Sequence, residues 1–285
     1  MHLARPAQTA PRTPDTHRRA TDRPLHSLST MTPRLLALDT ATEALAVALR
    51  APAGRWCINE PGGKQASARL IPLLMDLLGQ AGLAMPAVQA IAFGQGPGAF
   101  TGLRTACAVA QGLALAHATP VLAIDSLLIV AEDARLQANA ANEPGGTDWW
   151  VAMDARIDEV YAAAYRHTAT GWQVLVAPQL CTLAALAAAW LAAPPTQVAG
   201  SAITAFADRL PWGDARCWPH SADRAAALLR LAEAAWAMGR SLPADQALPL
   251  YLRDKVAQTT AERLALRSAA AVAASTVANT SGHTP

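Results

Sequence analysis

Charged side chains are scarce in this chain of 285 residues, where Asp, Glu, Lys and Arg together account for only 15%. Residues 1–33 carry five Arg and two acidic residues, whereas residues 34–258 carry sixteen Lys or Arg and eighteen acidic residues. Because affinity for a phosphate backbone is largely electrostatic, this mildly acidic body is a poor stand-alone nucleic-acid binder. The whole chain is 52% hydrophobic, which is enough to form one large or two small packed domains.

Residues that commonly bind metals are few, and their spacing is unsuitable. None of the four cysteines belongs to a C-x-x-C pair, and no two of the seven histidines stand three or four positions apart. Neither H-x-x-x-H nor H-E-x-x-H therefore occurs, so we expect no metal site. The cysteines are interpreted as reduced, packed thiols of a cytoplasmic protein. They are Cys57, Cys107, Cys181 and Cys217.

No apolar run approaches the roughly 20 residues that cross a bilayer, so we expect no membrane contact and a cytoplasmic location. The N-terminus lacks the apolar core of a secretory signal. It is rich in Arg, but its four prolines between residues 6 and 24 would break the amphipathic helix of a mitochondrial transit peptide. We interpret residues 1–33 as a disordered arm, or residues 1–30 as the product of an upstream start codon with Met31 as an alternative start.

Apolar patterning predicts alternating strands and helices over residues 34–138. Short apolar runs at 35–38, 44–49 and 55–59 predict a three-stranded meander. Helices are expected at 67–80 and 100–117, with strands at 88–93 and 121–124. A third helix is expected to begin at Ser126, which is interpreted as its cap.

The pattern restarts after a polar, turn-rich stretch at 139–148. Strands are expected at 149–153, 159–165 and 172–176, and helices at 182–193, 203–210 and 222–238. Asp39 and Asp154 end the first strand of each half. The repeat predicts a duplicated α/β fold of the actin, Hsp70 and hexokinase type (ASKHA, ribonuclease H-like) with two mixed-sheet lobes. We place the lobes at 34–138 and 139–258, followed by a disordered tail at 259–285.

The most specific motif is GPGAFTGLR at residues 96–104. Gly96 and Gly98 allow backbone angles that are closed to other residues, and Thr101 is able to cap the helix that follows. Because helix N-termini attract anions, a phosphate or carboxylate could bind at this turn. The same residues also fit a tight strand-to-helix turn that binds no ligand.

The longer run GPGAFTGLRTACAVAQGLALA resembles the signature of the TsaB (YeaZ) family. Further resemblances follow in family order, with LDTAT at 38–42, MDAR at 153–156 and PLYLR at 249–253. The resemblance covers about residues 34–257. Two departures stand out, because Ala99 replaces a serine that the family usually carries, and ASAR at 66–69 replaces His-Ser-Glu-Arg.

The resemblance implies a non-catalytic scaffold subunit of the complex that makes N6-threonylcarbamoyladenosine in tRNA. The related TsaD, which shares the superfold and carries an H-x-x-x-H metal pair, would be the transferase. This chain would bind and activate TsaD together with the ATPase TsaE, and would contact tRNA only through the complex. No cofactor of its own is expected. A homodimer, and a nucleotide at a subunit interface, are left open.

Active members of the superfold usually carry glycine directly after the Asp of each phosphate hairpin. Here Thr40 and Ala155 occupy those positions, and their Cβ atoms would crowd a phosphate. Arg156 either fills the vacated position by pairing with Asp39 or Asp154, or binds an anion. The alternative functions are an ATP-binding ATPase or kinase and, less well supported, a glycoprotease-type protease. We expect only a remnant anion or nucleotide site, composed of Asp39, Thr40, Gly96, Gly98, Thr101, Asp154 and Arg156.

The partner surface implied by the resemblance lies on the helices at 67–80 and 100–117. The second helix is apolar on nearly every face, which fits either a fully internal helix or an interface, and the resemblance favours the interface. The residues predicted to form it are Ser67, Leu70, Leu74, Phe100, Leu103, Ala106, Ala110 and Leu113.

Overall fold

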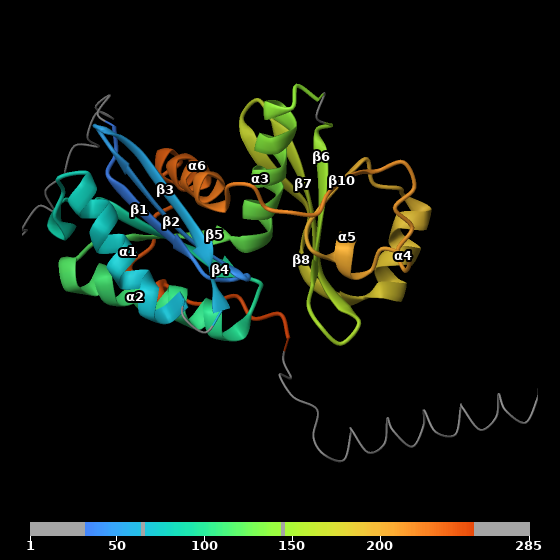
Figure 1. Cartoon of the computed structure of the whole chain (residues 1–285), viewed down its shortest axis with the longest axis horizontal. Coiled ribbons are helices and arrows are strands. Elements are labelled where there is room, and N and C mark those ends of the chain that lie inside the picture. The colour runs from blue at the N-terminus through green and yellow to red at the C-terminus, as the bar shows by residue number, and fades with distance from the viewer. Residues whose placement is uncertain (1–31, 64–65, 144–145, 254–285) are drawn as a thin grey trace, which may run out of the picture. The chain divides into compact units, whose positions relative to one another are not determined.

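A computed structural model describes residues 32–63, 66–143 and 146–253, which form two five-stranded sheets (Figure 1). The first sheet has the order β3–β2–β1–β4–β5. Strand β1 pairs antiparallel with β2 and parallel with β4. The strands are β1 (Leu35–Asp39), β2 (Ala44–Ala51), β3 (Gly54–Pro61), β4 (Ala90–Gly96) and β5 (Val121–Asp125).

The second sheet repeats the topology of the first, because its order is β8–β7–β6–β9–β10. Strand β6 pairs antiparallel with β7 and parallel with β9, as β1 does with β2 and β4. Asp39 and Asp154 end the two equivalent strands. The predicted duplicated α/β fold is therefore confirmed. The strands are β6 (Asp148–Asp154), β7 (Glu159–Thr168), β8 (Gly171–Thr182), β9 (Gln197–Ala199) and β10 (Arg216–Trp218).

Helices cover both faces of each sheet. On the first sheet, α1 and α2 lie on one face, where Leu70, Leu74 and Phe93 belong to the same buried cluster (Figure 1). On the second sheet, α4 and α5 pack around Trp190 and Val198. The helices are α1 (Ala66–Gln80), α2 (Phe100–His117), α3 (Ser126–Ala140), α4 (Leu183–Ala192), α5 (Ala202–Ala205) and α6 (Arg224–Ala237), with one-turn helices η2 (Met85–Ala87) and η3 (Ala244–Gln246).

The other two faces are covered by exchanged helices. Helix α6 follows β10 in the chain but packs on β1 and β2, where Leu228 lies in a cluster with Ala37. Helix α3 follows β5 but packs on β6 and β7, where Leu127 joins Trp149. The predicted boundary at 139 thus separates the strands of the two sheets but not the helices that cover them, and the exact domain limits stay a prediction.

Most element ends match the sequence pattern. Helix α2 spans the predicted residues, and α1 begins at Ala66, one residue early. Strand β10 was missed, and the helix expected at 203–210 is the single turn α5. Most of the predicted arm and the whole predicted tail lie outside the described residues. Within the described ranges, no helix combines the length and apolarity needed to cross a bilayer.

The predicted interface was wrong for five of its residues. Helix α2 turns Ala106, Ala110 and Ala114 toward the sheet, because their small side chains let the helix backbone approach it closely. Ser67 is exposed, whereas Phe100 and Leu113 are half-buried. The apolar residues that α2 leaves exposed include Ala108 and Leu115, on its opposite side. The five buried residues are Leu70, Leu74, Leu103, Ala106 and Ala110.

Matched substitutions test which face of α2 is internal. Ala110→Glu places an unpaired carboxylate in the core and should lower the free energy of unfolding by about 3 kcal/mol or more. Ala108→Glu, half a turn away on the exposed side, should change it by no more than about 0.5 kcal/mol. Urea unfolding followed by circular dichroism measures both. Equal losses would mean that the face of α2 has been assigned wrongly.

Candidate functional site

A cleft of about 950 Å³ opens between the turn that joins β1 to β2 and the turn that joins β6 to β7, here termed the first and second hairpin turns. The start of α2, helix α3 and the segment 250–253 also line it. Its apolar wall includes Leu127, Met153 and Trp218. Its polar wall includes Ser126, Asp133 and Arg224, all of which are buried. The cleft is large enough for a small molecule. The groups that line it therefore decide what it can do.

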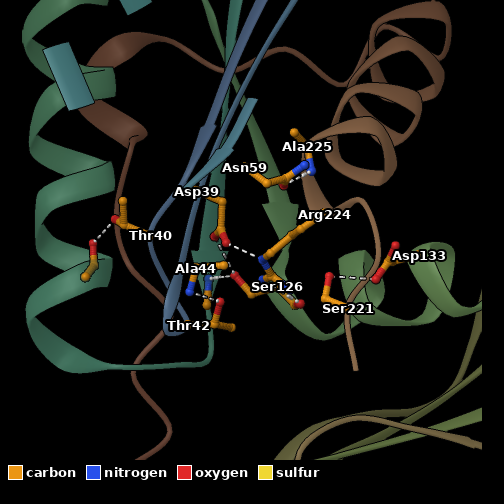
Figure 2. A network of polar contacts seen from close by, with 12 residues as sticks. Asp39, Thr40, Thr42, Ala44, Asn59, Ser126, Asp133, Ser221, Arg224 and Ala225 are labelled. Atoms are coloured by element: carbon orange, nitrogen blue, oxygen red, sulfur yellow. Dashed lines mark hydrogen bonds and ion pairs between the residues drawn. The ribbon is translucent and has the colours of Figure 1, made fainter. Parts of the chain in front are cut away.

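The central contact beside the cleft is a buried ion pair between Asp39 and Arg224. Asp39 ends the buried strand β1 and has no exposed surface, and Arg224 begins α6 and is 2% exposed. Arg224 Nε donates to Asp39 Oδ2 at 2.6 Å, as Figure 2 shows. Removing either charge would leave the other desolvated and unpaired, so the two residues act as a unit.

Ser126 links this ion pair to the turn at residues 96–98, here termed the glycine-rich turn. Its hydroxyl donates to Asp39 Oδ1 at 3.4 Å (Figure 2). The same hydroxyl accepts from Gly96 N at 3.0 Å. Arg224 Nη2 also donates to the Ser126 carbonyl at 3.3 Å. Ser126 is thus occupied by long-range contacts. Its predicted role as the helix cap was wrong.

The cap of α3 is Asp125, whose side chain accepts from the amides of Leu127 and Leu128. Tyr165 Oη, on the second sheet, donates to the same carboxylate at 2.6 Å. Burial raises the pKa of Asp125, and the bond from Tyr165 opposes this shift. Burial and the neighbouring carboxylate also raise the pKa of Tyr165, so this contact between the sheets keeps its phenol protonated.

The start of α6 is fixed by a second buried carboxylate, Asp133 on α3. It accepts from Ser221 Oγ at 2.6 Å, Ala222 N at 3.0 Å and Asp223 N at 2.8 Å. Asn59 on β3 accepts from Ala225 N at 2.9 Å (Figure 2). These bonds position the first turn of α6 and therefore aim Arg224 at Asp39.

The glycine-rich turn packs tightly against the end of the first hairpin. Gly96 has φ +114°, a conformation that favours glycine. A Cβ on Gly98 would collide with the carbonyl oxygen of Ala41, which accepts from Ala99 N at 2.7 Å. Thr40 Oγ1 donates to the Gly102 carbonyl at 2.7 Å. The glycines therefore bring two pieces of backbone together, which fits the interpretation of a tight turn without a ligand.

The start of α2 also corrects a prediction. Ala99 is the residue in the N-cap position, and it provides no side-chain cap within the described range 66–143. Thr101 lies inside the first turn instead, so its predicted capping role was wrong. The missing hydroxyl at Ala99 is the one noted as a departure from the family pattern.

The second hairpin turn carries Arg156 at the rim of the cleft. Its Nη1 lies 3.1 Å from Asp154 Oδ2, and its Nη2 lies 3.2 Å from Glu43 Oε1 on the first hairpin. The side chains of Arg156 and Glu43 are 73% and 93% exposed, so this bridge adds little stability. Pairing of Arg156 with Asp154 is confirmed. Pairing with Asp39 was wrong, because Arg224 occupies that carboxylate.

The structure separates the predicted site residues into two groups. Asp39, Thr40, Gly96 and Gly98 gather at the end of the first sheet. Asp154 and Arg156 lie on the other hairpin turn. Sequence reasoning missed Arg224, although an Arg at the start of an Ala- and Leu-rich helix was a usable signal. Across the described residues, no three His, Cys, Asp or Glu side chains meet in a group suited to a metal ion.

Comparison with known proteins decides the family. A family profile described as TsaD, the tRNA N6-adenosine threonylcarbamoyltransferase, matches residues 58–209. The tRNA threonylcarbamoyladenosine biosynthesis protein TsaB of Escherichia coli is 31% identical over 238 residues, which cover 79% of this chain and 96% of that protein. This chain belongs to the TsaB (YeaZ) family.

Other members of the TsaB family agree with this assignment. TsaB of Haemophilus influenzae is 36% identical over 156 residues, which cover 52% of this chain and 64% of that protein, just under two thirds. The solved structure of YeaZ from Pseudomonas aeruginosa has 40% sequence identity and a TM-score of 0.68, covering 77% of this chain and all of that chain. The resemblance inferred from the motifs is therefore confirmed at the level of fold and family.

A double-mutant cycle tests the Asp39–Arg224 pair. Asp39→Asn and Arg224→Met should each lower the free energy of unfolding by about 3–5 kcal/mol, because each leaves a buried partner without its counter-charge. The double variant should lose clearly less than the sum of the two, with a coupling of about 0.5–3 kcal/mol. Urea denaturation measures all four proteins.

Arg216→Met is the matched control for this cycle. Arg216 pairs with Glu143 at the surface, where both side chains are 46% exposed. Its loss should cost no more than about 1 kcal/mol. Additive losses for Asp39→Asn and Arg224→Met, or a control as destabilised as Arg224→Met, would refute the coupling.

Restoring the family serine tests the missing cap. Ala99→Ser should raise the free energy of unfolding by about 0.5–1 kcal/mol, because a serine hydroxyl in the N-cap position accepts from an unpaired amide of the first turn. Ala108→Ser, at an exposed position inside the same helix, should lower it slightly instead. The two urea midpoints should move in opposite directions. A shift in the same direction would contradict the cap assignment.

Proposed function

We propose that this chain is a non-catalytic scaffold that binds and activates a TsaD homologue, together with TsaE, in the formation of N6-threonylcarbamoyladenosine in tRNA. Membership of the TsaB family supports the pathway. The observation that carries the scaffold role is the Asp39–Arg224 pair. The carboxylate that ends the first strand is neutralised inside the protein, so it is not free to hold a metal-bound nucleotide.

The packing of the glycine-rich turn supports the same conclusion. The Ala41 carbonyl accepts from Ala99 N and lies against Gly98, so this backbone amide is already used. Phosphates bound in turns rely on free backbone amides. The turn therefore offers one amide donor fewer than an ATPase or kinase could use there.

The outward side of α1 and α2 is the proposed docking face for TsaD. Ile71 and Met75 on α1 are 46% and 39% exposed, and Leu115 on α2 is 62% exposed. The two helices contact each other and lie side by side (Figure 1). Ala108 and Gly112 on α2 are also exposed, and their small size lets a partner helix approach closely.

The same face accounts for the other expected partners. A homodimer through α1 and α2 would bury the same apolar residues and would therefore compete with TsaD. Because residues 34–258 carry a net negative charge, we propose that tRNA is contacted only within the complex. A nucleotide bound at the interface between subunits stays compatible with this arrangement.

Leu115→Glu tests the docking face. The variant should fold normally, because the side chain is largely exposed, but should weaken binding to the purified TsaD homologue by about tenfold or more, since its carboxylate would be desolvated in the interface. Leu191→Glu is the matched control, because Leu191 is 71% exposed on α4 of the other sheet. Calorimetric titration measures the affinity, and thermal melting verifies the fold.

Two outcomes would reject the proposed function. One is full modification of tRNA by TsaD and TsaE in a reconstituted reaction that lacks this chain. The other is tight binding and turnover of magnesium ATP by the isolated chain, which would favour the ATPase or kinase alternative. Equal binding of TsaD by Leu115→Glu and Leu191→Glu would place the contact elsewhere on the surface.

A further inference from the structure

Residues 248–253, here termed the strap, contact both sheets. The strap follows Ala247, which is buried in the core of the first sheet. Leu250 N donates to the Gln95 carbonyl at 2.8 Å, near the end of β4. Arg253 Nη2 then donates to the Ala155 carbonyl at 2.8 Å, on the hairpin turn of the second sheet. The four residues from Leu250 to Arg253 thus connect the end of β4 with the turn after β6.

The turn that Arg253 contacts has an unusual backbone. Three successive residues other than glycine have positive φ, namely Arg156 at 67°, Ile157 at 56° and Asp158 at 55°. Side chains disfavour this conformation, and it persists where surrounding contacts hold it in place. The exposure of Arg156 and Ile157 means that the core does not hold this turn. The contacts must come from the residues around its base.

Arg253 supplies several of these contacts. Besides the Ala155 carbonyl, its Nη2 reaches the Arg156 carbonyl at 3.3 Å and Glu159 Oε2 at 2.7 Å. The turn itself is closed by two backbone bonds, from Ala155 N to the Glu159 carbonyl and from Glu159 N to the Arg156 carbonyl. Arg253 therefore braces the backbone that these two bonds close.

The strap also contacts the first turn of α2. The ring of Tyr251 lies 5.3 Å from that of Phe100, and its hydroxyl accepts from Arg104 Nε at 3.0 Å. The Arg104 guanidinium lies over the Phe100 ring, 3.9 Å from its centroid. Tyr251 and Arg104 are both exposed, so this aromatic and cationic group is accessible from outside.

We propose that the strap couples docking on α2 to the conformation of the 155–158 turn. The inference rests on the proposed function, because the docking face lies on the same helix as Phe100 and Arg104. A partner that covers the first turn of α2 holds Tyr251 in place and so favours the state in which Arg253 is attached. Coupling is reciprocal, so the attached strap raises the affinity for the partner.

The consequence concerns the rim of the cleft. When Arg253 is attached, the backbone of Arg156 is fixed and its guanidinium lies between Asp154 and Glu43. When it is detached, the strained turn keeps its contacts with Asp154 and Arg209 but loses those of Arg253, so it relaxes more readily. The strap thereby transmits the presence of a partner on the first sheet to a charged side chain on the second.

Hydrogen exchange of the isolated chain provides the first test. Arg253→Met should speed exchange of the Ala155 and Glu159 amides by about tenfold or more, because the bonds that close the turn open more often. Arg240→Met, which replaces an exposed Arg after α6, is the control and should leave the exchange rates of these amides unchanged. Tyr251→Ala should also speed amide exchange at the turn, although Tyr251 contacts α2 and not the turn itself. Leu248→Ala, at an exposed strap residue, is its control.

Affinity for the TsaD homologue provides the second test. Arg253→Met should weaken binding by about fivefold or more although Arg253 lies off the docking face, as expected of a typical coupling between sites. Unchanged exchange in Tyr251→Ala, or unchanged affinity in Arg253→Met, overturns the coupling. If the wild-type chain does not bind TsaD, the proposed function fails instead. The exchange data on the isolated chain still decide whether the strap braces the turn.

Discussion

The position of α6 and the polar wall of the cleft both depend on one buried positive charge, the guanidinium of Arg224. Asp39 is fully buried at the end of the first strand, and a carboxylate in that position needs a counter-charge because desolvation strongly penalises it. Arg224 supplies the charge from the first residue of α6, so α6 must lie on the first sheet with its N-terminus at the cleft. Asp133 and Asn59 then hold that end of the helix. The same arrangement gives the cleft its polar wall and pairs the acid with a cation inside the protein.

The repeated topology was predictable because its signals are local. Each half starts with an apolar run that ends in Asp, and each continues with turn residues and two more strands. Helix α2 was predicted with correct ends because GPG precedes it, and it stops before Ala118, which has the left-handed conformation common at helix ends. The exchange of α3 and α6 was not predictable in this way. Both helices have apolar faces that fit either sheet, and long-range packing makes the choice.

The site was less predictable than the fold for related reasons. The partner of Asp39 lies 185 positions away in the chain, and no spacing rule connects them. Thr101 and Ser126 have the chemistry of caps, but the N-cap positions lie two residues and one residue earlier, at Ala99 and Asp125, and of these two only Asp125 caps its helix. On α2, periodicity could not separate the inward face from the outward one, because the helix is apolar on nearly all sides. Only the exposure of each side chain in the folded protein distinguishes the inward face of α2 from its outward face.

The exchange of helices has a consequence for how the protein is made. On the inner face of the first sheet, Ala37, Ala46 and Ala48 pack against α6, which begins only at Arg224. When the ribosome has completed β5, the last strand of that sheet, about 100 residues remain to be translated before α6, which covers the sheet. During that interval the growing chain presents an apolar sheet surface to solvent or to a chaperone. The first sheet therefore acquires its final form only late in translation, when most of the chain has emerged.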